Sequence, residues 1–197
     1  IYRDGVYVSG RREIEQNMIK HIPTLKDAQR TEVMKYLEIL CVENHTTDNA
    51  NLIAFNNGIY DLMNDKMLEF SPEIIITNKI PWDYNPEAYS ELLDKTLNKM
   101  ACNDATIRML LEESMGYCFY RRNELSKAFF LTGEGANGKS TFLDIVKNVL
   151  GKPNTSALDL NELDEKFSPA MMLGKLANIA DDISDEFLQG RAMANLK

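Results

Sequence analysis

The chain has 197 residues, a net charge of -8 and 44% hydrophobic residues. These values are ordinary for a globular protein, so they exclude wholesale disorder, and the length indicates one or two domains. No apolar run reaches the roughly 18 residues that a membrane span needs, and no secretory signal stands at the N-terminus. The acidity argues against a protein that coats polyanions, although a nucleic-acid enzyme with a local basic site remains compatible with it. Because the first residue is not Met, we expect the natural start of the gene product to lie upstream.

The cysteines and histidines indicate neither a disulfide framework nor a metal site. Cys41, Cys102 and Cys118 form an odd, scattered set, which is typical of reduced thiols in a cytosol. We expect these cysteines to lie in the core. His21 and His45 lack partner ligands at metal spacing, so both are expected in ordinary surface or loop positions. These features predict a cytoplasmic protein.

The N-terminal part predicts a mixture of helices and short strands. Residues 1–9 alternate apolar residues around Asp4-Gly5, a dipeptide typical of a tight hairpin turn. Apolar residues at helical spacing predict helices over 14–22 and 33–41. Residues 52–70 then predict short strands that are joined by Asn-rich turns.

The pattern changes after a segment with three prolines, residues 71–86, which predicts an irregular crossing. Two amphipathic helices are expected next, over 92–100 and 107–118, with Asp104 as the cap of the second. The predicted organisation has three parts. Residues 1–86 are expected to form an α+β N-terminal domain, with a winged-helix type as one alternative. Residues 87–124 form a helical connector, and residues 125–197 form a phosphate-loop ATPase core.

The last part predicts the beginning of a parallel α/β domain. Residues 127–133 (KAFFLTG) are a continuous apolar run, which is typical of a strand in a sheet that is buried on both faces. The apolar spacing of residues 142–150 predicts a helix that ends at Gly151. Residues 176–180 predict a second buried strand. Strand, glycine loop, helix and strand follow one another as in parallel α/β folds.

The glycine loop carries the most specific motif of the chain. Residues 133–140 (GEGANGKS) fit the pattern G-x-x-x-x-G-K-[ST] without a departure. Glycines let successive N–H groups face one anion, and the following helix points the positive end of its dipole at the same place. Lys139 is expected to reach the β- and γ-phosphates, and the Ser140 hydroxyl is expected to bind Mg²⁺. The predicted nucleotide contacts are Gly133, Glu134, Gly135, Ala136, Asn137, Gly138, Lys139, Ser140 and Thr141.

A phosphate loop also needs a carboxylate at the end of a neighbouring strand. Asp181 and Asp182 follow the apolar run of residues 176–180. We assign Asp181 to the Mg²⁺ shell, directly or through water, and expect Asp182 to orient or deprotonate the attacking water. Which of the two contacts the metal stays open, and both could instead cap the next turn.

Several segments together resemble the superfamily 3 helicases found in phage and plasmid primase-helicases. They are GEGANGKST at 133–141, the acidic pair, AFNNGIYDL at 54–62, the SPE…TN…P stretch at 71–81 and LDEKFSPAMMLGK at 163–175. The resemblance covers nearly the whole chain. It implies a poxvirus-type N-terminal region before an AAA+-type ATPase with an incomplete parallel sheet.

The resemblance further implies an ATP- and Mg²⁺-dependent DNA helicase in the replication of a mobile element, in the cytoplasm of a bacterial host. Its members form rings, with six subunits as the expected number, and carry DNA-gripping residues, a sensor strand and an arginine finger. These parts are expected after Lys197, and any primase activity before Ile1. In the family the sensor strand lies between the phosphate-loop strand and the acidic-pair strand. We therefore expect this chain alone to bind nucleotide weakly and to unwind no DNA.

Other functions remain open at this point. The phosphate loop also fits a small-molecule kinase or a DNA-packaging motor, although neither an acceptor pocket nor a lid is identifiable. A non-catalytic nucleotide-binding or docking module is a third reading. Trp82 could stack on a base or anchor the crossing segment, and residues 117–122 could contact nucleic acid or simply end a helix.

Overall fold

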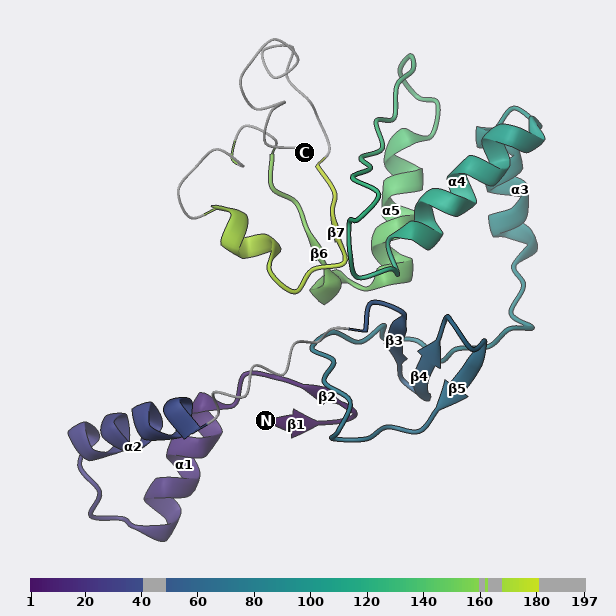
Figure 1. Ribbon diagram of the computed structural model, residues 1–197. Helices are drawn as coiled ribbons and strands as arrows, with labels where there is room; N and C mark the ends of the chain where they lie inside the picture. Colours follow the sequence, from purple (N-terminus) through teal and green to yellow (C-terminus); the bar gives the residue numbers. More distant parts are fainter. Residues whose placement is uncertain (41–48, 160–161, 163–167, 181–197) are drawn as a thin grey trace. The chain divides into compact units, whose positions relative to one another are not determined.

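The computed structural model describes residues 1–40, 49–159, 162 and 168–180 (Figure 1). Cys41, His45, Asp181 and Asp182 therefore lie outside the described residues. The chain divides into two compact units. Unit 1 holds Ile1–Asn49 and Phe70–Thr77, and unit 2 holds Ala50–Glu69 and Asn78–Lys197.

Unit 1 opens with the predicted hairpin. Strands β1 (Tyr2–Arg3) and β2 (Val6–Tyr7) pair antiparallel, with Tyr2 opposite Tyr7. The turn needs a left-handed backbone, with φ of 48° at Asp4 and 88° at Gly5. A Cβ on Gly5 would lie 2.3 Å from the Phe70 ring, so only glycine allows that ring to close over the turn. The Asp4-Gly5 prediction is confirmed.

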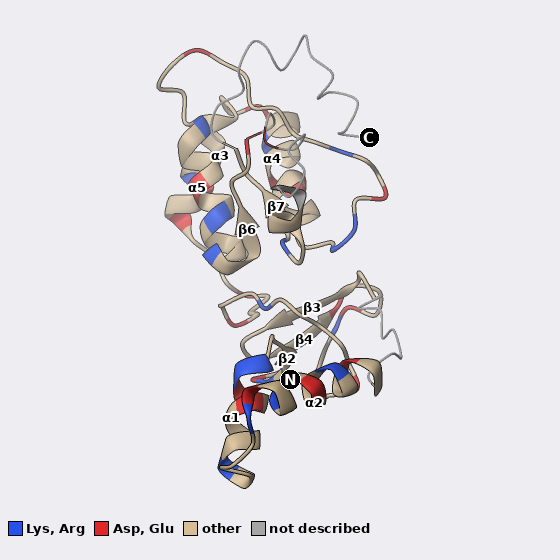
Figure 2. Ribbon diagram, turned by 90° about the vertical axis from the view of Figure 1, so that its left-hand side faces the viewer, with Lys and Arg blue, Asp and Glu red and all other residues tan. Residues whose placement is uncertain are grey.

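Two helices complete unit 1, α1 (Arg11–His21) and α2 (Asp27–Leu40), and both were expected from the apolar spacing. Their packing is sparse: α1 has no buried residue, and α2 buries only Met34. Figure 2 shows acidic and basic residues mixed along both helices. The charges of this helix pair thus do not form a face of one sign.

Unit 2 begins with an antiparallel sheet of order β3-β4-β5, formed by Leu52–Phe55, Gly58–Asp61 and Lys66–Leu68. Phe55 pairs with Gly58, so the two turn residues are Asn56 and Asn57, one position before the Asn57-Gly58 signal in the sequence. Asp61 ends β4 and closes the next turn. Its carboxylate accepts hydrogen bonds from the Met63 N–H at 2.9 Å and from the Asn64 Nδ2 at 2.7 Å.

The Asp61 turn predicts an acid-sensitive contribution to stability. The hydrogen bond from the Asn64 side chain is the largest cause that lowers the pKa of Asp61, and main-chain N–H groups add to it. A carboxyl with a lowered pKa in the fold contributes stability above its unfolded pKa of about 3.9, and this is lost as the pH falls through the folded pKa. Urea unfolding between pH 7 and pH 2.5 should therefore show a smaller loss at acid pH for Asp61→Asn than for the wild type. Asp83→Asn is the control, because Asp83 is exposed. If the free energy of unfolding decreased equally toward acid pH in all three proteins, the role of Asp61 would be contradicted.

Helices α3 (Glu91–Met100) and α4 (Ala105–Tyr117) follow, each with a side-chain cap. Ser90 Oγ accepts from the Leu93 N–H, and Asp104 Oδ1 accepts from the N–H groups of Thr106 and Ile107. The predicted Asp104 cap is confirmed. Arg108 of α4 links the two helices, since its Nη2 lies 3.0 Å from Asp94 Oδ1 on α3.

The remaining elements carry a short parallel pair. Helix α5 (Lys139–Leu150) ends at Gly151, whose φ is 82°, and a 3₁₀ turn (Lys152–Asn154) leads into β6 (Thr155–Ser156). A second 3₁₀ helix (Ser168–Met172) precedes β7 (Ala177–Asn178), which pairs parallel with β6. The core of unit 2 is formed by residues from β3, the crossing segment, α3, α5 and the position directly after β7. Its buried members are Ile53, Phe55, Ile80, Leu97, Phe142, Val146, Leu150 and Ile179.

Trp82 links the crossing segment to α5. Its indole Nε1 donates to the Asn148 carbonyl at 2.9 Å, and its own carbonyl accepts from the Asn56 N–H at 2.9 Å. The indole ring nevertheless remains exposed. Of the two roles left open for Trp82, these hydrogen bonds support the anchoring of the crossing segment.

Two expectations are corrected. Residues 127–133 form no strand, and Phe129 and Phe130 are 48% and 46% exposed rather than buried. A strand exists only with a hydrogen-bonded neighbour, and no described residue is assigned as a ladder partner of this segment. Cys102 is exposed in the turn after α3 and is not a core residue, whereas Cys118 is half-buried. In the compact units, Ala50–Glu69 lies with α3 and α5, since Ile53 and Phe55 share their core. The domain boundaries at 86 and 124 stay a prediction.

Candidate phosphate-binding loop

The predicted phosphate loop turns sharply into α5. Ala136 and Gly138 have left-handed backbones, with φ of 58° and 93°, and Gly138 is the N-cap residue of α5. At the start of the loop Gly133 has a φ of 151°, and a Cβ there would lie 2.1 Å from Asn137 Nδ2. A φ in this region is strained for other residues, so glycine is favoured at 133.

Lys139 lies at the centre of this loop. Its Nζ donates to the carbonyl oxygens of Gly133 and Glu134 and to Asn137 Oδ1, each at 2.9 Å. All three acceptors are neutral oxygens of the loop itself. Among the described residues, the positive charge is therefore held beside the first turn of α5 by neutral oxygens and not by a carboxylate.

The other predicted loop contacts are open to solvent. Glu134, Gly135 and Asn137 are exposed, as are Ser140 and Thr141 in the first turn of α5. Free N–H groups at a helix start, one ammonium and one hydroxyl are the groups that bind polyphosphate and Mg²⁺. The described loop thus supplies groups that are chemically suited to a phosphate, and one hydroxyl, on Ser140, that is suited to a metal ion.

The acidic half of the predicted site can be followed only up to Ala180. β7 and the buried Ile179 lead toward Asp181 and Asp182, which lie outside the described residues. Within the part of the chain that the structure describes, no group of three His, Cys, Asp or Glu side chains could hold a metal ion.

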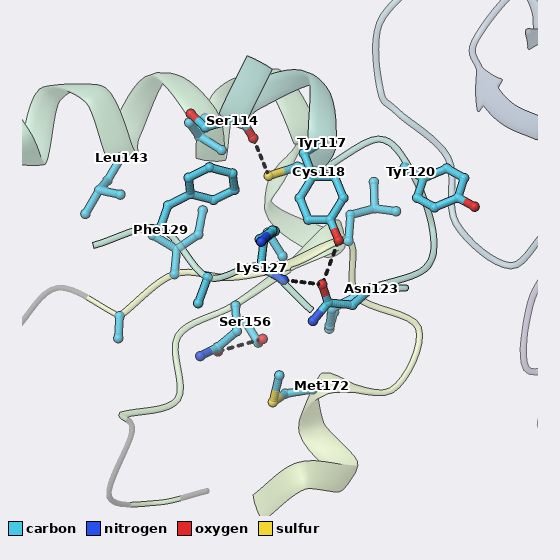
Figure 3. A pocket seen from close by; sticks show the side chains of 18 of the residues that line it. Ser114, Tyr117, Cys118, Tyr120, Asn123, Lys127, Phe129, Leu143, Ser156 and Met172 are labelled. Carbon is cyan, nitrogen blue, oxygen red and sulfur yellow. Dashed lines mark hydrogen bonds between the residues drawn. The ribbon is translucent and has the colours of Figure 1, made fainter. Parts of the chain in front are cut away.

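A groove of about 490 Å³ lies between residues 127–130 and the β6–β7 pair (Figure 3). Cys118, directly after α4, and Phe142 and Val146 of α5 contribute to its wall. Four cationic side chains line it, and no acidic one does so among the described residues. These cations are Arg121, Arg122, Lys127 and Lys175.

Side chains of the aromatic and basic segment at residues 117–127 form hydrogen bonds with one another and with the main chain of the same segment. Asn123 Oδ1 accepts from the Tyr117 hydroxyl at 2.7 Å and from the Lys127 main-chain N–H at 3.1 Å, as Figure 3 shows. Glu124 accepts from the Tyr120 hydroxyl and from Arg122, both at 2.9 Å. The hydrogen bond to Glu124 is the largest cause that raises the pKa of Tyr120. These local bonds account for several of the polar groups that suggested a nucleic-acid contact.

Burial changes the pKa of two side chains that line the groove, Cys118 and Arg121. Burial raises the pKa of the Cys118 thiol, which donates to the Ser114 carbonyl at 3.3 Å. Burial lowers the pKa of Arg121, and the charge of Arg122 adds to this effect.

Two asparagines around β6 and β7 hold this region together and were missed in the sequence. Asn178 Oδ1 accepts from the Ser156 hydroxyl and from the Leu158 N–H, both at 2.9 Å. The second, Asn154, is 3% exposed, and its main-chain carbonyl accepts from the Leu176 N–H at 2.7 Å. Neither residue belongs to a motif, so no spacing in the sequence could have identified them.

Comparisons with known proteins divide the chain into two matched regions. Residues 8–102 match the family model "D5 N terminal like", and residues 131–197 match a family of unknown function, DUF5906. In the described residues, no helix is long and apolar enough to cross a bilayer.

Two viral relatives share part of the chain. "Putative helicase L207/L206" of Acanthamoeba polyphaga mimivirus is 29% identical over 127 residues, which are 61% of this chain and 13% of that protein. "Putative helicase 184R" of Invertebrate iridescent virus 6 is 33% identical over 132 residues, which are 64% of this chain and 12% of that protein. The chain thus spans only a small fraction of the relatives that it matches. The D5 N-terminal model and the two helicase-named relatives are thus what parts of this chain are similar to.

Proposed function

We propose that this chain is the ATP-binding portion of a replicative DNA helicase of a phage or mobile element, belonging to the superfamily 3 helicases with an AAA+-type ATPase. The single observation that carries the proposal is the position of Lys139. Its ammonium is held inside the loop that the motif predicts, at the start of α5, by three neutral oxygens. A cation whose described acceptors are all neutral, beside the N–H groups of a helix start, suits the binding of a polyphosphate.

Each loop residue has a role in this proposal. The N–H groups of residues 133–139 would surround the phosphates, Lys139 would donate to the β- and γ-phosphates, and the Ser140 hydroxyl would hold Mg²⁺. Mg-ATP, when bound, supplies the phosphoanhydride whose hydrolysis drives unwinding. Asp181 is proposed as the metal-shell carboxylate and Asp182 as the group that orients water.

The groove gives additional support to the AAA+-type arrangement. Residues 127–130 run along one side of it, and β7 lies along the other, parallel to β6. In the family that the sequence resembles, one further strand lies between the phosphate-loop strand and the acidic-pair strand. A groove between these two segments is compatible with such a strand, and no described residue is a ladder partner of residues 127–133.

DNA and a homo-oligomeric ring are the proposed partners. The relatives carry the word helicase in their names, and the ring follows from the resemblance alone. Strand separation by the complete gene product on a forked duplex tests the proposal. Turnover of ATP without strand separation would favour another phosphate-loop enzyme, and nucleotide binding without turnover would favour a docking module.

The central role of Lys139 can be tested by replacing it with alanine. Because a hydrogen bond from an ammonium to a charged oxygen contributes about 1.5–3 kcal/mol, Lys139→Ala is expected to weaken nucleotide binding about 10-fold to 100-fold. The measurement is a titration with a fluorescent ATP analogue.

Lys147→Ala is the matched control, because Lys147 lies on the same helix and faces Asp144 at 3.9 Å. It should bind nucleotide like the wild type. Equal affinities of the wild type and Lys139→Ala would exclude the loop as the nucleotide site.

A further inference from the structure

The ammonium of Lys139 uses all its hydrogen-bonding capacity inside the loop. A lysine has three N–H donors, and three oxygens accept one each: the Gly133 and Glu134 carbonyls and Asn137 Oδ1, all at 2.9 Å. For Lys139 to donate to a phosphate oxygen, at least one of these hydrogen bonds must break.

The three acceptors differ in how firmly they are held. Two are main-chain carbonyls, whose positions are set by the backbone of the loop. The third belongs to the side chain of Asn137, which is exposed and can rotate about two bonds without moving the backbone. The Asn137 amide is therefore the acceptor that can leave Lys139 at the smallest cost.

The same side chain also spans the loop. Its Nδ2 lies so close to Gly133 that a Cβ there would approach it to 2.1 Å. Asn137 thus contacts the first glycine and the lysine of the motif, although the motif itself leaves position 137 open. The two ends of one amide thus lie beside the first glycine and the lysine of the motif, and the amide oxygen accepts the hydrogen bond from Lys139.

We infer that Asn137 is a positioning residue that keeps the Lys139 ammonium in place before phosphate binds and then yields its hydrogen bond to a phosphate oxygen. The inference rests on the proposed nucleotide site. Because the amide competes with the phosphate for Lys139, it lowers nucleotide affinity while it keeps the loop ordered. A direct phosphate ligand at this position would have the opposite effect, since its removal would weaken binding.

Nucleotide titration of two variants separates these roles. Asn137→Ala removes the competing acceptor and is expected to bind a fluorescent ATP analogue about 3-fold to 10-fold more tightly, the range that one net hydrogen bond supports. Asn137→Asp replaces the amide with a carboxylate that pairs with Lys139 and repels phosphate, so binding should weaken about 10-fold or more. The matched control is Asn148→Asp, which adds the same charge at an exposed position near the other end of α5. It should bind like the wild type.

A second measurement needs no nucleotide. Brief acetylation, followed by peptide mass spectrometry, reports how accessible the Lys139 ammonium is. Asn137→Ala should raise the acetylation rate of Lys139 about 3-fold or more, because one of its three hydrogen bonds is gone. The other lysines of the same digest are the internal reference, and circular dichroism confirms that the variant is folded.

The outcomes distinguish this inference from the proposed function. Weaker binding by Asn137→Ala, or an unchanged acetylation rate, overturns the role of Asn137 while the nucleotide site stands. If wild type and Lys139→Ala both fail to bind nucleotide, the proposed function fails, and the transfer of the hydrogen bond to phosphate fails with it. Tighter binding by Asn137→Ala together with faster acetylation supports the inference.

Discussion

Replacing Asn154 with aspartate is expected to lower the free energy of unfolding of unit 2 by about 3–5 kcal/mol at pH 7. Asn154 is 3% exposed, and its Nδ2 donates to the carbonyls of Lys79 and Leu150 at 2.8 Å and 2.7 Å. An aspartate has no N–H to donate, and its charge would face two carbonyl oxygens in a buried place. One amide therefore joins the crossing segment to the end of α5, and its loss separates them.

Urea unfolding followed by Trp82 fluorescence measures this effect. Trp82 is the chain's one tryptophan and lies in unit 2 beside α5. Asn154→Ala, which removes the donor without adding a charge, should cost about 1–3 kcal/mol. Asn85→Asp is the matched control, because the exposed Asn85 side chain uses its oxygen, which an aspartate keeps, to accept from the Glu87 N–H at 3.0 Å. A loss below about 1 kcal/mol in Asn154→Asp would contradict the role of this amide.

Leu97→Ala is the second substitution with a large expected effect, a loss of about 2–5 kcal/mol in the free energy of unfolding. Leu97 on α3 is 2% exposed and belongs to the core that also holds Phe142 and Leu150 of α5. Truncation removes buried apolar area and leaves a cavity that the surrounding helices fill only in part.

The same helix offers the control for Leu97. Leu92 on α3 is 77% exposed, so Leu92→Ala should change stability by less than about 0.5 kcal/mol. The helix propensity of both positions changes alike, so the difference between the two variants isolates the burial of Leu97. Similar losses for both variants would show that α3 does not pack as described.

Local features could be predicted because a few neighbouring residues encode each of them. The hairpin at Asp4-Gly5 depends on a left-handed turn, and the start of α4 depends on the Asp104 carboxylate. The end of α5 at Gly151 depends on a backbone conformation that glycine adopts readily. In each case the local structure follows from one or two residues, through their backbone conformation or through a side-chain hydrogen bond to nearby N–H groups.

The strand expected over residues 127–133 shows where such reasoning ends. Its apolar run is suited to a buried strand, but burial and pairing depend on partners elsewhere in the chain. Among the described residues the parallel pair forms between β6 and β7, and Phe129 and Phe130 stay half exposed. An apolar pattern therefore indicates that a segment is suited to burial. Whether it forms a strand depends on the segments that pair with it.

The sequence by itself determined the phosphate-loop motif, most helices and the turns, because each is written within about ten consecutive residues. Only the tertiary structure decided which groups meet across long separations. Asn154 contacts the Lys79 carbonyl, 75 residues away, and no pattern marks either residue. It likewise placed the Asn137 amide between Gly133 and Lys139. The physical reason is that hydrogen bonds and packing between distant residues depend on the folded path of the chain, which residue spacing does not encode.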